Sequence, residues 1–242
     1  GQLDLDNKIL RHVSPAFAED PLRVFRVARF AALLTDFSIA EETMALMSTM
    51  SKSGELQTLS AERVWQELSK ALAGANAKRF FAVLAQCHAL THWLPELLKV
   101  WPQSTNAGAS AAQCFAHLPL VESEYLSLAE RLRVPNSFLQ LALDRCQHLQ
   151  HLVNFRALSA VSLYTCFASL QALHSDERLV ALLDLLPDPE QRVELIAQLP
   201  PLAEGLKTVT LSDAEKLGLQ GRAFGERLKA KRITWLESQL QR

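Results

Sequence analysis

Apolar residues recur three or four positions apart along most of the chain, and segments that alternate apolar and polar residues are hard to find. Residues with this spacing lie on one face of a helix. Glycine is sparse, with 8 residues in 242, while leucine and alanine, which favour helices, are abundant. The pattern predicts an all-α fold of many helices, without a fixed-period repeat.

Capping residues predict where these helices begin and end. Asp20-Pro21 has the order of an N-cap followed by the first helical position, Ser60 and Ser212 are further N-caps, and Pro200-Pro201 should end a helix. A last helix should run towards the C-terminus. The other expected helices lie at about 21–35, 40–50, 61–74, 78–87, 118–132, 136–153, 159–172, 177–186, 189–199 and 213–218.

The segment after residue 101 differs from the rest, because it is rich in small and polar residues up to residue 113. Such a composition is typical of a linker or a mobile loop. We therefore expect a first helical domain at 1–101, a linker or mobile loop at 102–116, and a second helical domain at 117–242.

Composition limits the function in three ways. The formal net charge is −1, so any nucleic-acid-binding surface must be local. The four cysteines form no CxxC pair, which argues against a zinc knuckle and a secreted disulfide framework. No apolar run approaches the roughly 20 residues that a membrane span needs. We expect a reduced, cytoplasmic protein without membrane contact.

A local basic segment lies near the end of the chain and contains Arg222, Arg227, Lys229, Lys231 and Arg232.

A polar stripe at the start of the first long helix offers candidate chemistry. It contains Asp20, Arg23, Arg26 and Arg29 at steps of three residues, so Asp20 and Arg23 should be neighbours. An adjacent carboxylate and guanidinium can read a base: Arg23 donates to the ring acceptor of cytosine or adenine, and Asp20 accepts from the amino group. Guanine and uracil present a ring N–H where cytosine and adenine present an acceptor, and a carbonyl oxygen where these two present an amino group. The alternative is an ordinary N-cap with an intrahelical ion pair.

Residues spread over the first hundred positions, and a few later ones, resemble bacterial class II tRNA nucleotidyltransferases, the CCA-adding enzymes, and related poly(A) polymerases. The matching segments are Gly1-Gln2, Asp4-Leu5, Leu10–Phe17, Glu19–Arg23, Arg29–Ala32, Gly54–Leu56, Glu62–Glu67, Pro95–Leu97, Arg131–Asn136 and Leu219–Arg222.

The resemblance implies roles for several of these residues. In that family an EDxxR motif pairs with incoming CTP and ATP, which implies this role for Asp20 and Arg23. An RxxxExxK motif, met here by Arg63, Glu67 and Lys70, would brace the helix that carries them. A surface ion-pair run is the alternative for these three. Residues 1–101 would be the family's neck, and the basic C-terminal residues would hold tRNA, unless they form only a solvated amphipathic helix.

Two family features are not found in the sequence. The catalytic head, with its Gly-Ser motif and its Mg²⁺-binding aspartates, is not recognisable, and Asp4 and Asp6 are poor candidates for that pair. We therefore expect no metal or cofactor in this chain, Mg²⁺ in a separate head, and no nucleotidyl transfer by the chain alone. A His-Asp phosphohydrolase site is also not found, and His148 and His151 are expected to be surface or packing residues.

Two alternatives remain open at this stage. A poly(A) polymerase of the same family would accept ATP alone. A stand-alone helical RNA-binding or interaction module would never join a catalytic head. The sequence does not predict the oligomeric state.

Overall fold

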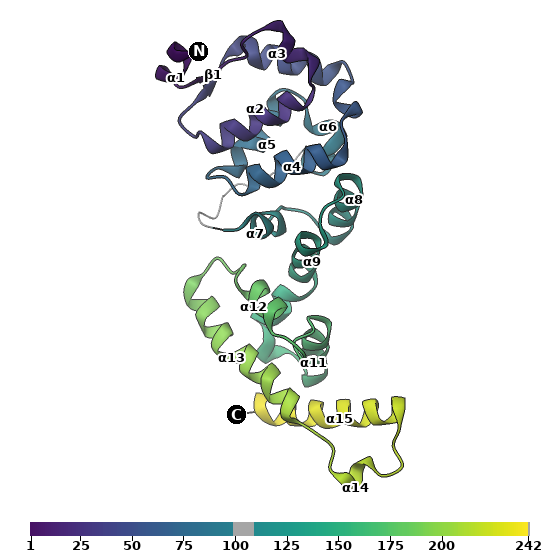
Figure 1. Cartoon of the computed structure of the whole chain (residues 1–242). Helices are drawn as coiled ribbons and strands as arrows, with labels where there is room; N and C mark the ends of the chain where they lie inside the picture. The colour runs from purple at the N-terminus through teal and green to yellow at the C-terminus, as the bar shows by residue number, and fades with distance from the viewer. Residues whose placement is uncertain (99–108, 242) are drawn as a thin grey trace. The chain divides into compact units, whose positions relative to one another are not determined.

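The computed structural model describes residues 1–98 and 109–241, and most of these residues lie in helices (Figure 1). The expected all-α class is confirmed. The chain divides into two compact units, Gly1–Ala142 and Leu143–Arg242, and each is considered by itself. Among the described residues no helix is both long and apolar enough to cross a membrane.

Unit 1 is built around the helix that carries the polar stripe. Its elements are α1 (Gln2–Asp6), β1 (Ile9–Leu10), η1 (Pro15–Glu19), α2 (Leu22–Leu33), β2 (Ser38–Ile39), α3 (Glu41–Lys52), η2 (Glu55–Thr58), α4 (Ala61–Leu72), α5 (Ala77–Gln86), α6 (Leu90–Trp93), η3 (Pro95–Leu97), α7 (Ala111–Ala116), α8 (Glu122–Leu132) and most of α9 (Asn136–Asp144).

Helix α2 packs against both α4 and α5 (Figure 1). Half of its buried residues are alanines, and Ala28, Ala31 and Ala32 are fully buried beside Phe25. Small side chains allow helix axes to approach closely, so α2 is held between its neighbours along most of its length. Helix α4 begins where expected, because Ser60 Oγ accepts a hydrogen bond from the Arg63 N–H at 3.4 Å.

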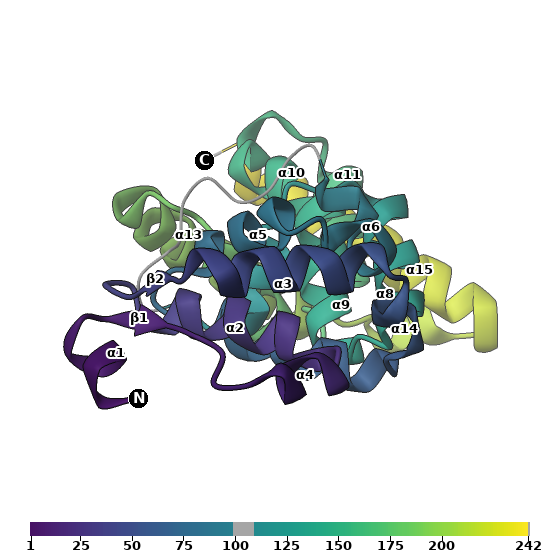
Figure 2. The same cartoon turned by 90° about the horizontal axis from the view of Figure 1, so that it is seen from above.

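A two-stranded parallel ladder flanks α2 in the sequence. Ile9 of β1 pairs with Ser38 of β2, and Leu10 pairs with Ile39 (Figure 2). The segments before and after α2 are therefore hydrogen-bonded to each other.

The expected linker at 102–116 falls partly outside the described residues, since 102–108 are not among them. Its described end differs from the expectation, because Ala111–Ala116 forms α7. The ring of Phe115 is fully buried and meets Trp65 of α4 edge-on, with ring centroids 5.6 Å apart. Helix α7 thus belongs to the core of unit 1, and the two units divide later, within α9. For residues 102–108 the linker stays a prediction.

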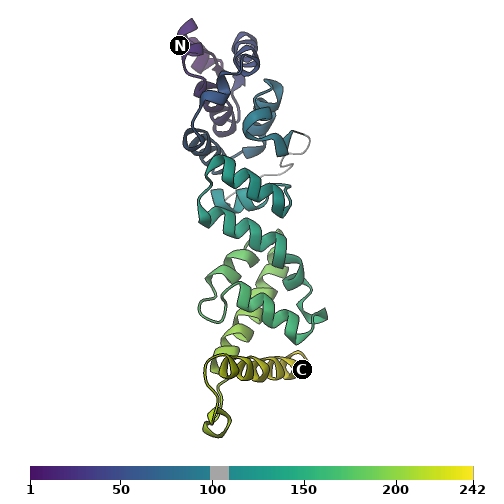
Figure 3. The same cartoon turned by 90° about the vertical axis from the view of Figure 1, so that its right-hand side faces the viewer.

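Unit 2 contains η4 (a π-helical turn, Arg145–Leu149), α10 (Gln150–Val153), η5 (Phe155–Ala157), α11 (Ala160–Ser169), α12 (Glu177–Leu183), α13 (Pro189–Thr208), α14 (Asp213–Lys216) and α15 (Gly221–Leu240). Helix α15, yellow in Figure 3, packs against α11 and α13. The prediction that a helix ends at Pro200-Pro201 is wrong, because α13 continues through both prolines to Thr208.

Candidate functional site

Asp20 lies just before α2 and not inside it. Its backbone is extended (φ −123°, ψ 101°), and Pro21, not Asp20, is the N-cap residue. Asp20 nevertheless satisfies a free donor of the first turn, since its Oδ1 accepts from the Leu22 N–H at 3.2 Å. The carboxylate also accepts hydrogen bonds from Arg63 Nη2 of α4, at 3.1 Å to Oδ1 and 3.4 Å to Oδ2.

Arg23 occupies the first turn of α2 and points back towards η1. One Nη1 hydrogen bond goes to the carbonyl oxygen of Ala16, and its guanidinium lies 5.9 Å from the centre of the Phe17 ring. Among the described residues no ion pair joins Asp20 and Arg23. The expected ion pair is not formed, because the Arg23 side chain turns to the Ala16 carbonyl and Asp20 turns to Arg63. The two residues are still neighbours, since the Arg23 N–H donates to the Asp20 carbonyl oxygen at 3.0 Å.

Glu67 of α4 is the partner of the two later arginines of the stripe. Its side chain is 6% exposed and accepts from Arg29 Nε at 2.5 Å. Its other oxygen lies 3.6 Å from Arg26 Nε. Arg29 is 15% exposed and Arg26 is 51% exposed, so Arg29 is bound within the packed structure while Arg26 projects outward.

The structure therefore brings most of the predicted nucleotide-binding and bracing residues to the contact of α2 with α4. Arg63 holds Asp20, and Glu67 holds Arg29 and Arg26. Lys70, the third residue of the predicted motif, is exposed, and no ion pair to it is found in the described part of the chain. Arg63 and Glu67 thus contact the stripe, and Lys70 does not.

Sequence reasoning missed a residue that anchors the other end of α2. Arg79 of α5 donates to the carbonyl oxygens of Leu34, Thr35 and Phe37, at 3.3 Å and 2.7 Å for the first two. These carbonyls follow the last turn of α2, where backbone acceptors lack helical partners. No motif in the sequence signals this role, because the contacts span more than 40 positions.

The five basic residues of α15 do not form one free basic face. Arg222 pairs with Glu226 at 2.7 Å, Lys231 pairs with Glu215 of α14 at 2.6 Å, and Lys229 lies over the Tyr164 ring. Arg232 is half-buried, and its Nε is buried without a hydrogen-bond partner. Arg227 is exposed, and no ion pair to it is found among the described residues.

A family model matches residues 36–100 and is described as the probable RNA and SrmB-binding site of polymerase A. The CCA-adding enzyme of Pseudomonas putida is 35% identical over 98% of this chain and 69% of its own length. That of Coxiella burnetii is 35% identical over 96% of this chain and 64% of its own length. The chain thus spans about two thirds of these curated relatives.

Solved structures agree on the fold. The complex of a CCA-adding enzyme with ATP matches 99% of this chain and 63% of its own length, with a TM-score of 0.63 and 18% identity. The Thermotoga maritima CCA-adding enzyme in complex with tRNA matches 98% of this chain and 62% of its own length, with a TM-score of 0.61 and 18% identity. Together with the sequence matches along nearly the whole chain, this similarity shows that the chain belongs to the CCA-adding enzyme family.

Proposed function

We propose that this chain is the nucleotide-selecting and tRNA-binding portion of an enzyme that adds CCA to tRNA 3′ ends, with Asp20 and Arg23 reading the incoming base. The observation that carries the proposal is the ion-pair network between α4 and the segment that runs from Asp20 into α2. Asp20 is fixed by Arg63, and Arg29 is fixed by Glu67. A residue that only capped α2 would not need a partner from α4.

Both proposed base-reading groups keep hydrogen-bonding capacity. The Asp20 carboxylate has about four acceptor sites, and the contacts with Leu22 and Arg63 leave room for an exocyclic amino group. A guanidinium has five N–H donors, and the contact of Arg23 with the Ala16 carbonyl leaves donors for a ring nitrogen or a cytosine O2. Neither side chain is fully exposed, and both are tied to the backbone of η1 or α2, which limits their movement.

Base selection follows from this arrangement. Cytosine and adenine each present an amino group beside a ring acceptor, which complements the pair. Guanine and uracil would leave a donor or an acceptor unpaired, at a cost of about 1–3 kcal/mol for each buried group. The pair can therefore favour CTP and ATP without a nucleic-acid template.

The test joins the chain to a catalytic domain of the family and measures incorporation of all four nucleotides into tRNA that lacks its end. Asp20→Ala and Arg23→Ala should each reduce discrimination against GTP and UTP by about 10-fold or more, which corresponds to 1.4 kcal/mol or more. Glu41→Ala, a change at an exposed acid of α3 outside both motifs, is the control and should leave selectivity unchanged. Unchanged selectivity in the Asp20 variant, together with a large loss of melting temperature, would support a plain capping role.

A poly(A) polymerase is the second candidate, because the matching family model is described as a site of polymerase A. The same assay separates the two. Incorporation of ATP alone, with no CTP at any position, would favour poly(A) addition. Ordered incorporation of CTP followed by ATP is the result expected for CCA addition.

A further inference from the structure

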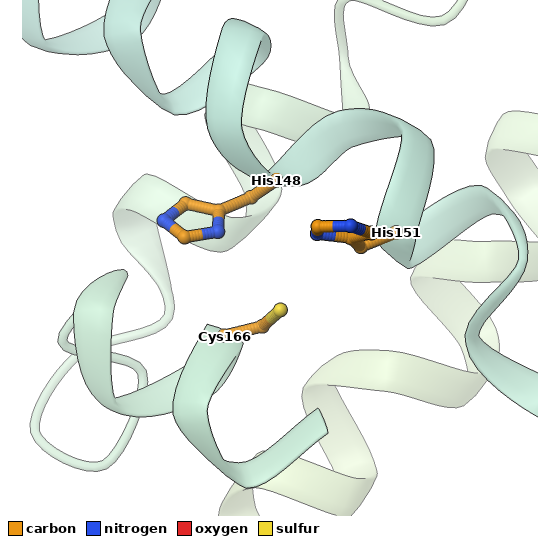
Figure 4. A group of neighbouring side chains, drawn as sticks. All are labelled: His148, His151 and Cys166. Atoms are coloured by element: carbon orange, nitrogen blue, oxygen red, sulfur yellow. The ribbon is translucent and has the colours of Figure 1, made fainter. Parts of the chain in front are cut away.

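Three side chains of unit 2 with metal-binding atoms converge outside the site described above. One ligand atom each from His148, His151 and Cys166 lies within 4.8 Å of the others. Figure 4 shows the two imidazole rings and the thiol turned towards a common point. Two imidazole nitrogens and one sulfur form a donor set that suits Zn²⁺ and other borderline-soft divalent cations, and does not suit Mg²⁺ or Ca²⁺.

The local backbone explains how the group is assembled. His148 lies in the π-helical turn η4, His151 lies in α10, and Cys166 faces them from α11. A π-turn is rare and changes the direction of the side chains that follow it, and it is frequent at functional sites. Its start is held by Asp144, a 2%-exposed side chain that accepts two hydrogen bonds from Arg178 of α12, at 2.7 and 3.1 Å.

His148 is already oriented for coordination. Its Nε2 lies 2.9 Å from Ser169 Oγ, and Figure 4 shows its second ring nitrogen on the side of Cys166 and His151. A hydrogen bond to one imidazole nitrogen fixes the ring and leaves Nδ1 for a metal, as in most metal-binding histidines. His148 is half-buried, His151 is exposed and Cys166 is buried, so solvent reaches the group at His151.

The protonation states also fit. Burial lowers the pKa of His148, which outweighs the nearby Asp144 carboxylate and favours the neutral form of the ring. Burial raises the pKa of the Cys166 thiol, so it binds a metal only by losing its proton. Binding of one divalent cation would thus release one proton to solvent.

We propose that unit 2 binds one Zn²⁺ through His148 Nδ1, His151 and Cys166 Sγ. Ligand atoms around tetrahedral zinc are about 3.3–3.7 Å apart, so the side chains must close by about 1 Å, which small side-chain rotations allow. The fourth position would hold water. The three proposed ligands line a pocket of about 330 Å³, together with Gln147, Val161 and Thr165, and this pocket has room for that water. The metal would link α10 to α11.

The experiment titrates the purified, reduced chain with Co²⁺ as a spectroscopic substitute, followed by displacement with Zn²⁺. We expect one equivalent of Co²⁺ to give thiolate-to-metal charge-transfer absorption and the visible bands of tetrahedral cobalt. Cys166→Ser should abolish the charge-transfer band. His151→Ala, a change at an exposed residue, should weaken Zn²⁺ binding by at least about 10-fold, because losing even an outer-shell partner typically costs about 10- to 100-fold.

Cys146→Ser is the matched control, because this exposed cysteine lies in the same π-turn outside the cluster. It should leave stoichiometry and spectra unchanged. Circular dichroism of each variant without metal checks that it folds. The proposal is overturned if the wild-type chain shows no charge-transfer band, if Cys146→Ser removes the band, or if folded His151→Ala binds Zn²⁺ as tightly as wild type.

Discussion

Glu67 carries its negative charge into the contact between α2 and α4, where two arginines neutralise it. Such a pair contributes little net stability compared with apolar packing, but removing one partner leaves the other charge buried and unpaired. Glu67 therefore holds Arg29 in place more than it stabilises the fold.

We expect Glu67→Ala to destabilise unit 1 by about 2–4 kcal/mol, because it leaves Arg29 uncompensated at 15% exposure. Glu62→Ala is the matched control on the same helix. Glu62 and its partner Arg133 are both largely exposed, so this change should cost less than about 1 kcal/mol. Urea unfolding monitored by circular dichroism gives both values, and equal losses would contradict a special role for Glu67.

The contact of Arg63 and Glu67 with the polar stripe could be predicted in part from the sequence alone. The spacing of Arg63 and Glu67 places them on one face of α4, and the family motif marks them as a brace. The partners could not be derived from spacing, because Arg29 and Glu67 are 38 positions apart. The ion pair expected between Asp20 and Arg23 is not found because Asp20 has a distant partner, Arg63, which is 43 positions away and could not be derived from spacing either.

At the scale of elements, α13 shows how packing overrides a local signal. Proline lacks an N–H and crowds the preceding turn, so two prolines should end a helix. Helix α13 continues because Leu195, Leu199, Ala203 and Leu206 bury one continuous face on both sides of Pro200 and Pro201. Capping signals were more reliable: Ser212 and Glu215 form the expected capping box.

Helix α13 also contacts α15 through a close approach at Gly205. A Cβ added there would lie 2.7 Å from Trp235 Cζ2, so the indole would have to move. We expect Gly205→Ala to destabilise unit 2 by about 1–3 kcal/mol through overpacking. Gly225→Ala is the control, because no atom lies within 4 Å of the added Cβ and alanine favours a helix interior. It should stabilise the chain by about 0.5–1 kcal/mol, measured by thermal unfolding.

Helix α14 is attached to α15 by the pair of Glu215 with Lys231. The hydrogen bond from Lys231, helped by the Ser212 backbone and hydroxyl, lowers the pKa of Glu215 from 4.5 to about 2. A lowered carboxyl pKa stabilises the folded chain above about pH 4.5, and this contribution is lost as the pH falls towards 2. We expect Lys231→Ala to return the pKa towards 4.5 in an NMR titration. Lys216→Ala, which removes the Lys216–Asp213 pair, should leave it unchanged.

At the scale of the whole molecule, RNA binding should depend on few basic residues of α15. Each phosphate contact contributes about 0.7–0.9 to the slope of log K against log salt. We expect Arg227→Ala to reduce this slope for tRNA by about one contact. Arg222→Ala should reduce it less, because Glu226 already neutralises Arg222. Filter binding of tRNA over a range of salt concentrations measures both slopes, and equal slopes for the two variants would indicate that the pairing has no effect.

The parallel ladder of β1 and β2 has a consequence for how unit 1 forms. It joins residues 29 positions apart, and the loop that it closes contains η1 and all of α2. Loops of this length have a modest closure entropy, and contacts between nearby segments form early in folding. The ladder thus brings the two ends of this segment together at a modest entropic cost, while α2 itself, a 12-residue helix whose buried face packs on α4 and α5, becomes stable only once those later helices are present.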